Sequence, residues 1–177
     1  MNKTNGKLMM ILVSFTSKNG STAEIAECIG KEIAKAGISC DISEMKKVTS
    51  ISNYDAIIIG APFYMGHIMK EFPAFINRYH AELVKLPVAA FAVGMAPLSN
   101  EPGSVEHAME VFRRSLQPLS PVTTILFAGR LEVQKLSFIS RKIIKLVNSP
   151  TGDYRDWDVI SSWTREFLDM LNEDKTG

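Results

Sequence analysis

An apolar run near the start of the chain, LMMILVSF at residues 8–15, most narrows the folds open to this sequence. Its apolar residues are continuous, without the three- and four-residue steps of an amphipathic helix. A continuous run is typical of a parallel strand that is covered on both faces. It is too short to span a bilayer and no small-residue cleavage site follows it, so we expect neither a transmembrane helix nor a signal peptide. We predict a buried strand over residues 7–15.

Helical and strand-like patterns then alternate along the chain. From Thr22, apolar residues recur at helical steps until Gly37, a typical C-terminal stop. Further strands are predicted at 39–45, 56–59, 88–94 and 122–129, and further helices at 69–83, 103–116 and from Asp156, which suits an N-cap. The closing helix carries one apolar face, made of Ile160, Trp163, Phe167 and Met170. Such repeated units predict an α/β fold, a parallel sheet with helices on both faces.

The composition fits one globular domain spanning residues 1–177, with 46% hydrophobic and 22% charged residues. A net charge of +1, without a basic block, gives no reason to expect nucleic acid as a partner. Cys28 and Cys40 lie in different predicted elements without a C-x-x-C spacing, so we expect neither a disulfide framework nor a metal site. Reduced thiols are typical of a cytoplasmic protein, which is the location we expect.

Small polar side chains crowd the junction between the first strand and the first helix, in SKNGST at residues 17–22. Ligands of doubly wound sheets collect at this edge. Hydroxyls, free backbone N–H groups and the positive end of the helix suit a phosphate dianion. The sequence has neither G-K-[ST] nor G-x-G-x-x-G here, which argues against a P-loop and a dinucleotide fingerprint. A helix cap without a ligand explains the same residues, so both interpretations stay open.

The stretch resembles the FMN-phosphate loop of flavodoxins, T-x-T-G-x-T, with matches at Gly20 and Thr22. The resemblance implies a flavodoxin-like doubly wound sheet of five parallel strands in the order 2-1-3-4-5, and FMN as the cofactor. It also implies phosphate ligands at Ser17, Asn19, Gly20, Ser21 and Thr22, with backbone groups from Thr16 and Lys18.

A second loop, in IIIGAPFYMGHIMKEFPAFI, is similar to the flavin-ring loop of flavodoxin-like proteins. A flat ring needs stacking surface, and Gly66 permits close backbone approach. The resemblance implies ring contacts from Pro62, Phe63, Tyr64, Met65, Gly66 and His67. A backbone carbonyl there is expected to accept a hydrogen bond from the reduced ring and to tune its potential. Ordinary packing explains Phe63 and Tyr64 equally, and a solvated loop explains His67.

A third strand end, GMAPLS, places Gly94, Met95 and Ala96 near the other edge of the ring, although a simple proline turn explains it as well. The C-terminal third, KIIKLVNSPTGDYRDWDVISSW, resembles flavodoxin-type protoporphyrinogen dehydrogenases, which carry a long insertion after the fifth strand. That resemblance implies an FMN-dependent oxidoreductase that passes hydrogen from protoporphyrinogen IX to menaquinone or a related quinone. The insertion here carries fewer aromatic residues than is typical of that family.

Two other functions fit the same loops. One is a non-catalytic flavodoxin-type carrier whose partner is a redox protein, although such carriers are generally acidic and this chain is neutral. The other is an NAD(P)H:quinone or FMN reductase, whose partner is a small redox molecule. No catalytic residue is predicted, because a flavin carries the redox chemistry itself. Asp153, Asp156 and Asp158 are assigned to capping of the last helix.

The insertion covers about residues 130–155 and is basic, with six positive and two negative side chains between Arg130 and Arg155. Residues 135–148 form an amphipathic pattern with apolar residues on one side and Lys or Arg on the other. A helix with this pattern either packs its apolar side on the domain or lies at an anionic membrane surface. The second interpretation predicts peripheral membrane contact, which would serve an enzyme with a lipid-soluble acceptor.

Overall fold

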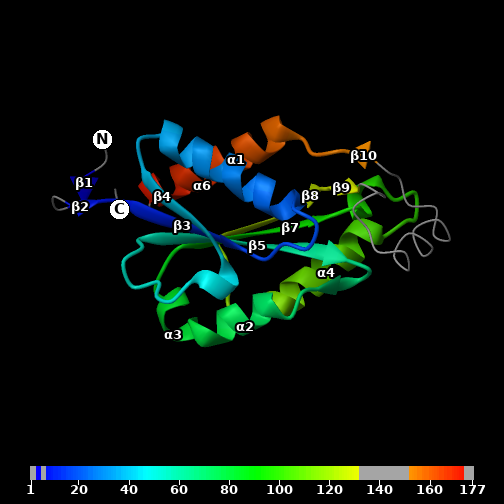
Figure 1. Cartoon of the computed structure of the whole chain (residues 1–177), viewed down its shortest axis with the longest axis horizontal. Coiled ribbons are helices and arrows are strands. Elements are labelled where there is room, and N and C mark those ends of the chain that lie inside the picture. The colour runs from blue at the N-terminus through cyan, green and yellow to red at the C-terminus, as the bar shows by residue number, and fades with distance from the viewer. Residues whose placement is uncertain (1–2, 5–6, 132–151, 174–177) are drawn as a thin grey trace.

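A twisted parallel sheet forms the centre of the fold in the computed structural model, which describes residues 3–4, 7–131 and 152–173 (Figure 1). Across the sheet lie, in order, β4 (Ser39–Glu44), β3 (Met10–Phe15), β5 (Ala56–Tyr64), β7 (Val88–Gly94) and β8 (Thr123–Ala128). In chain order this is the predicted arrangement 2-1-3-4-5, so the predicted fold class is confirmed. Ile57 of β5 lies opposite Leu12 of β3 and Val88 of β7, which places β5 in the middle.

Helices cover both faces of the sheet. On one face lie α1 (Ser21–Lys35) and α6 (Trp157–Glu173), side by side; on the other lie α2 (Glu71–Arg78), α3 (His80–Leu83) and α4 (Ser104–Leu116) (Figure 1). The shorter elements are β1 (Lys3–Thr4), β2 (Lys7–Leu8), η1 (Met45–Lys47), β6 (His67–Ile68), η2 (Ala96–Leu98), β9 (Arg130–Leu131) and β10 (Gly152–Asp153). None of the helices within the described ranges is long and apolar enough to cross a membrane.

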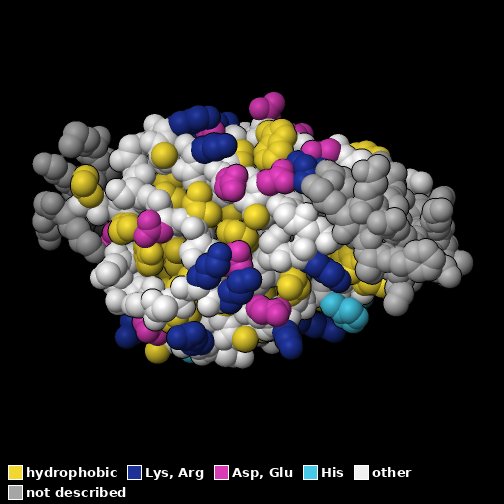
Figure 2. All heavy atoms as spheres, viewed as in Figure 1, with side chains coloured by type: hydrophobic (Ala, Val, Ile, Leu, Met, Phe, Trp, Pro, Cys, Tyr) yellow, Lys and Arg dark blue, Asp and Glu magenta, His cyan; other side chains and the backbone are white. Residues whose placement is uncertain are grey.

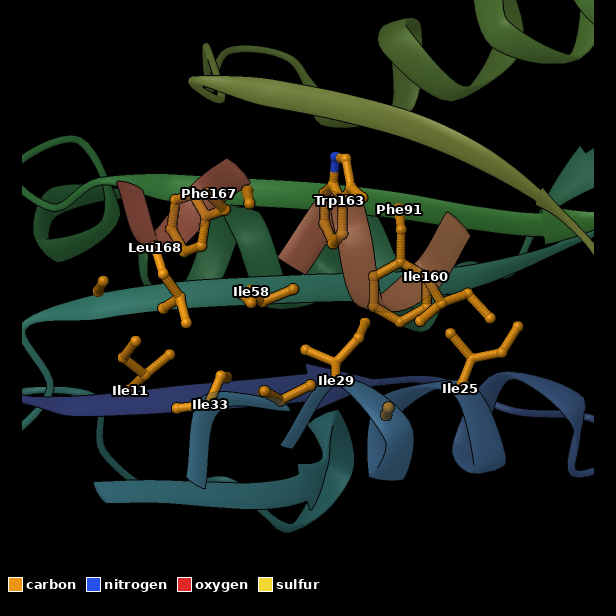
Figure 3. Packing of buried hydrophobic residues seen from close by; sticks show 14 of the residues in the cluster. Ile11, Ile25, Ile29, Ile33, Ile58, Phe91, Ile160, Trp163, Phe167 and Leu168 are labelled. Carbon is orange, nitrogen blue, oxygen red and sulfur yellow. The ribbon is translucent and has the colours of Figure 1, made fainter. Parts of the chain in front are cut away.

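The core between the sheet and α1 with α6 is built from branched apolar side chains (Figure 3). Ile11, Ile58 and Phe91 of the sheet meet residues of both helices, and each of these three is 0% exposed. Burying side chains of this size contributes roughly 1.5–3 kcal/mol each. The helix residues that complete this layer include Ile25, Ile29, Ile33, Ile160, Trp163, Phe167 and Leu168.

The third predicted strand is longer than the sequence indicated. We predicted a strand over 56–59, but β5 continues to Tyr64. The Ile57 N–H donates to Pro87 O on the β7 side, and Gly60 O accepts from the Thr16 N–H on the β3 side. The backbone groups of successive residues in a parallel strand point alternately to the two neighbouring strands, so those of Pro62 point toward β3. The pairing of β3 with β5 has already ended at Gly60, so no acceptor is left without a donor where Pro62 lacks its N–H. The proline therefore costs no ladder hydrogen bond.

Other boundaries differ in smaller ways. The predicted helix over 69–83 is divided into α2 and α3 at Tyr79. On α6, Met170 is 39% exposed and Leu171 takes the buried position, because steps of three and four residues from Phe167 and Leu168 lead to residue 171. Asp156 accepts hydrogen bonds from the N–H groups of Asp158 and Val159, as the predicted N-cap should. Asp153 was also assigned to this cap, but it pairs with Arg155 instead. The amphipathic segment 135–148 lies outside the described residues, so its membrane contact stays a prediction.

Candidate functional site

An open cleft lies where the strands end at their carboxyl edge. Its walls come from the loop after β3 with the start of α1, from the ends of β5 and β7, and from the segment that follows β8, although these segments are far apart in the sequence. The lining residues are Lys18, Asn19, Ser21, Thr22, Pro62, Phe63, Tyr64, Val93, Gly94, Met95, Gly129, Arg130 and Leu131. The structure thus brings together residues from all three predicted flavin-binding loops, and it does so at the edge where parallel sheets bind ligands.

The N-terminus of α1 forms one wall of the cleft. Gly20 occupies the N-cap position with φ of 90°, a left-handed conformation that favours glycine. The first helical hydrogen bond runs from the Glu24 N–H to Gly20 O, so the N–H groups of Ser21, Thr22 and Ala23 precede the ladder. Within the described chain no side chain caps this helix end. An anion therefore finds unshared N–H donors and the positive end of the helix dipole here.

Hydroxyl groups around this helix end have different surroundings. The Ser17 hydroxyl accepts a hydrogen bond from the Gly20 N–H at 3.1 Å and so shapes the loop. The Ser21 hydroxyl accepts one from the Arg130 N–H at 3.2 Å, and its own proton remains available to a ligand. Thr22 lines the cleft and is 2% exposed. Thr16 is buried, with its N–H on Gly60 O and its hydroxyl near the Met69 sulfur at 3.5 Å.

The opposite wall is aromatic. Pro62, Phe63 and Tyr64 at the end of β5 are all half-buried and all line the cleft. The Lys18 ammonium lies 3.9 Å from the centroid of the Tyr64 ring, so the phosphate loop and the aromatic wall are in direct contact. A Cβ on Gly94 would come within 3.1 Å of Phe63 O, so a larger residue here would require the backbone at Phe63 to shift by a few tenths of an ångström.

The remaining predicted ring residues form a tight hairpin at the rim of the cleft. Tyr64 pairs with His67, which leaves Met65 and Gly66 as a two-residue turn with φ of 51° and 80°. Positive φ at both central residues defines a type I′ turn, which explains the glycine. Met65 and His67 are exposed. Seven of the predicted flavin-binding residues do not line the cleft itself, and their contact with a flavin stays a prediction: Thr16, Ser17, Gly20, Met65, Gly66, His67 and Ala96.

Four lining residues escaped the sequence prediction: Val93, Gly129, Arg130 and Leu131. The signal was available, because the fifth predicted strand ends at Gly129 and must end at the same edge as the other strands. Gly129 is held to β7 by a hydrogen bond from its N–H to Gly94 O at 2.9 Å. Gly129 also approaches the phosphate loop, since a Cβ on it would lie 3.7 Å from the Ser21 hydroxyl oxygen.

An ion-pair cluster borders the phosphate loop on its β8 side. The Glu24 carboxylate accepts hydrogen bonds from Arg130 at 2.7 Å and from Arg155 at 2.6 Å. Arg155 is 3% exposed and also donates to both oxygens of Asp153, at 2.8 and 2.5 Å. The hydrogen bond from Arg155 is the main reason that the pKa values of Glu24 and Asp153 lie below their usual range. We call these four residues the carboxylate–arginine cluster.

The chemistry available in the cleft is that of binding and orientation. In the described ranges, no group of three or more His, Cys, Asp or Glu side chains is arranged to hold a metal ion. The cleft instead offers helix N–H groups and hydroxyls at one end and flat aromatic surface at the other. These donors match a ligand with an anionic end and a planar apolar end, so the residues present fit a flavin mononucleotide.

Comparisons with known proteins agree with this fold. A family model described as a flavodoxin domain matches residues 12–158. The chain is 25% identical over 179 residues to protoporphyrinogen IX dehydrogenase (quinone) of Escherichia coli K12, covering 93% of this chain and 98% of that protein. It is 23% identical to the Leishmania major protein of the same name, covering 88% of this chain and 73% of that protein.

Solved structures show the same architecture. Oxidised flavodoxin 2 from Bacillus cereus superposes with a TM-score of 0.60 at 19% identity, covering 91% of this chain and 99% of that one. A flavoprotein in complex with FMN from Lactobacillus acidophilus has a TM-score of 0.51 at 15% identity, covering 68% of this chain and 93% of that one. At these identities the likeness concerns the fold alone.

Proposed function

The chain belongs to the flavodoxin domain family, and we propose that it is an FMN-dependent oxidoreductase. The observation that carries this proposal is the meeting of a hydroxyl-rich helix N-terminus and an aromatic wall in one cleft. Ser21 and Thr22 would hold the phosphate with the N–H groups of the first turn of α1. Phe63 and Tyr64 would orient the ring and keep water from it.

Bound FMN would supply the redox chemistry by accepting and returning two electrons with their protons. The protein's part is to position the ring against the substrate. The hairpin at Met65 and Gly66 lies at the rim of the cleft, next to Tyr64, where a bound ring would meet solvent and substrate. The exposed His67 follows directly. Substrate would therefore approach the ring past the β5–β6 turn.

We assign protoporphyrinogen IX as the electron donor and a quinone as the acceptor. The support is the likeness to protoporphyrinogen IX dehydrogenase (quinone), which extends over 98% of the length of the Escherichia coli protein. In each step two electrons and two protons would leave the porphyrinogen, and one quinone would take up both to become a quinol. Figure 2 shows acidic and basic side chains interspersed on the face that carries α1, rather than the single-sign surface that favours docking of charged partner proteins.

The cofactor is tested by titrating purified apoprotein with FMN, riboflavin and FAD while flavin fluorescence is recorded. We expect saturable quenching by FMN at one equivalent and weaker binding of riboflavin, which lacks the phosphate that α1 would bind. Equal affinity for FMN and riboflavin would contradict a phosphate site at this helix.

The substrate is tested by following porphyrin fluorescence after protoporphyrinogen IX and a soluble quinone are added to the FMN-loaded protein under anaerobic conditions. We expect turnover that requires both protein and quinone. Rapid bleaching of the flavin by NAD(P)H instead would favour a quinone or FMN reductase. Flavin that is reduced by neither donor, yet exchanges single electrons with a redox protein, would identify a carrier.

A further inference from the structure

The carboxylate–arginine cluster places a negative charge beside the proposed phosphate site. Glu24 lies in the first turn of α1, one residue after the last of the free N–H groups. Its Oε1 atom would lie 3.9 Å from a Cβ on Gly20, the residue at the centre of the phosphate loop. A carboxylate at a helix N-terminus interacts favourably with the helix dipole, but it also repels a second anion that binds to the same turn.

Two arginines neutralise this carboxylate, one on each oxygen. Arg130 reaches Oε1 at 2.7 Å and Arg155 reaches Oε2 at 2.6 Å. Both arginines are more than 100 positions after Glu24 in the sequence: Arg130 lies in β9, and Arg155 follows β10. Arg130 also lines the cleft, and its N–H donates to Ser21, a proposed phosphate ligand. The cluster therefore touches the phosphate loop through both Glu24 and Ser21.

Arg155 is fixed by more contacts than a typical surface ion pair makes. Its side chain is 3% exposed, its guanidinium forks onto Asp153, and its Cζ lies 4.5 Å from the centroid of the Trp157 ring. A buried arginine with this many fixed partners cannot move away from Glu24 without losing them. The charge on Glu24 is thus compensated before any ligand arrives.

We propose that Arg155 and Arg130 are positioning residues for the flavin phosphate, acting through Glu24. By pairing both oxygens of this carboxylate they let a phosphate dianion bind at the same turn of α1, and they set the preference for a phosphorylated flavin over riboflavin. The inference rests on the proposed FMN site. A purely structural alternative is that the cluster only ties β9 and β10 to α1; that role would affect both flavins alike.

The test compares FMN and riboflavin affinities of the wild-type protein with those of Arg155→Met and of the double variant Arg155→Met with Glu24→Gln. For Arg155→Met we expect FMN affinity to fall by about 10-fold, a typical size for one uncompensated charge near a helix end. Riboflavin affinity should stay unchanged. In the double variant Glu24 carries no charge, and Asp153 and Arg130 are the charged members of the cluster that remain. Their charges balance, so FMN affinity should return to within about 2-fold of the wild type.

The salt dependence of FMN affinity gives a second readout. Salt screens the repulsion between the unpaired Glu24 carboxylate and the phosphate, so added salt should reduce the loss of FMN affinity in Arg155→Met. An equal loss of affinity for FMN and riboflavin in Arg155→Met, or no recovery of FMN affinity on adding Glu24→Gln, would overturn the inference. Neither result would contradict the proposed FMN site. Wild-type protein that binds neither flavin would overturn the proposed function, and this inference with it. If Arg155→Met does not fold, Arg130→Gln serves instead, since Arg130 is 19% exposed and contacts the same carboxylate. The same selective loss and the same rescue are then expected.

Discussion

Gly60 of β5 and Phe91 of β7 lie opposite each other in the sheet, and a Cβ on Gly60 would come within 2.1 Å of the Phe91 ring. Gly60 is the residue whose carbonyl binds Thr16 at the start of the phosphate loop. The ring of Phe91 is fully buried and packs against Phe127 and Trp163 at centroid distances of 5.8 and 6.2 Å. The ring therefore has little room to give way.

Gly60→Ala should destabilise the fold by about 1–3 kcal/mol, the usual cost of overpacking a filled core. Urea unfolding followed by circular dichroism measures this difference. Phe91→Leu provides the matched control, because removing the ring makes space for the new methyl group. The double variant should lose less stability than the sum of the two single losses. Strict additivity would mean that the two residues do not compete for the same space.

Thr22→Ala should weaken FMN binding by about 1.5–3 kcal/mol, the range for a hydrogen bond to a charged group. Thr22 is nearly buried in the cleft at the first turn of α1, where its hydroxyl would face the phosphate. Riboflavin should bind as before, since it has no phosphate. Fluorescence titration with both flavins measures the effect.

Ser50→Ala is the control for this substitution. Its hydroxyl is exposed and pairs with Ser52, away from the residues that line the cleft. FMN affinity that is equal in Thr22→Ala and Ser50→Ala would remove Thr22 from the phosphate site.

Local patterns were enough to predict a parallel sheet with helices on both faces, and the resemblance to flavodoxins added the strand order that the structure has. Apolar strands and helical patterns such as that from Thr22 to Gly37 depend on local periodicity, and the structure contains both kinds of element. The strand predicted over 7–15 begins only at Met10, because Lys7 and Leu8 pair with β1 instead. The hydroxyl-rich loop was visible because its residues are neighbours in the chain. Contacts between distant residues were not visible: Glu24 pairs with Arg130 and Arg155, which are 106 and 131 positions away. No periodicity marks such partners.

Tyr64→Ala should weaken FMN and riboflavin equally, by about 0.5–1.5 kcal/mol, because it removes stacking surface and leaves the phosphate site intact. Tyr64 forms part of the aromatic wall and its ring carries the Lys18 ammonium at 3.9 Å. Tyr64→Phe keeps the ring and should bind both flavins like the wild type. A selective loss of FMN in Tyr64→Ala would instead mean that Tyr64 acts on the phosphate loop through Lys18.

Acid should weaken the attachment of β9 and β10 to α1. The direction of this pH dependence follows from the lowered pKa of Glu24. Hydrogen bonding from Arg155 holds this pKa below its ordinary value of 4.5 in the folded protein. The folded state therefore binds fewer protons than the unfolded chain, and the stabilisation is complete above pH 4.5 and is lost as the pH falls through the folded value. Asp153 behaves in the same direction, for the same reason.

Glu24→Gln isolates this contribution, because glutamine does not titrate while Asp153 titrates in both proteins. The free energy of unfolding in urea should be lower for Glu24→Gln than for the wild type near pH 7, where the wild-type carboxylate is ionised and paired with both arginines. The gap between the two proteins should narrow steadily as the pH is taken below 4.5, since protonation removes the same charge from the wild type. A gap that stays constant over this range would mean that Glu24 stabilises the fold through packing and not through its charge.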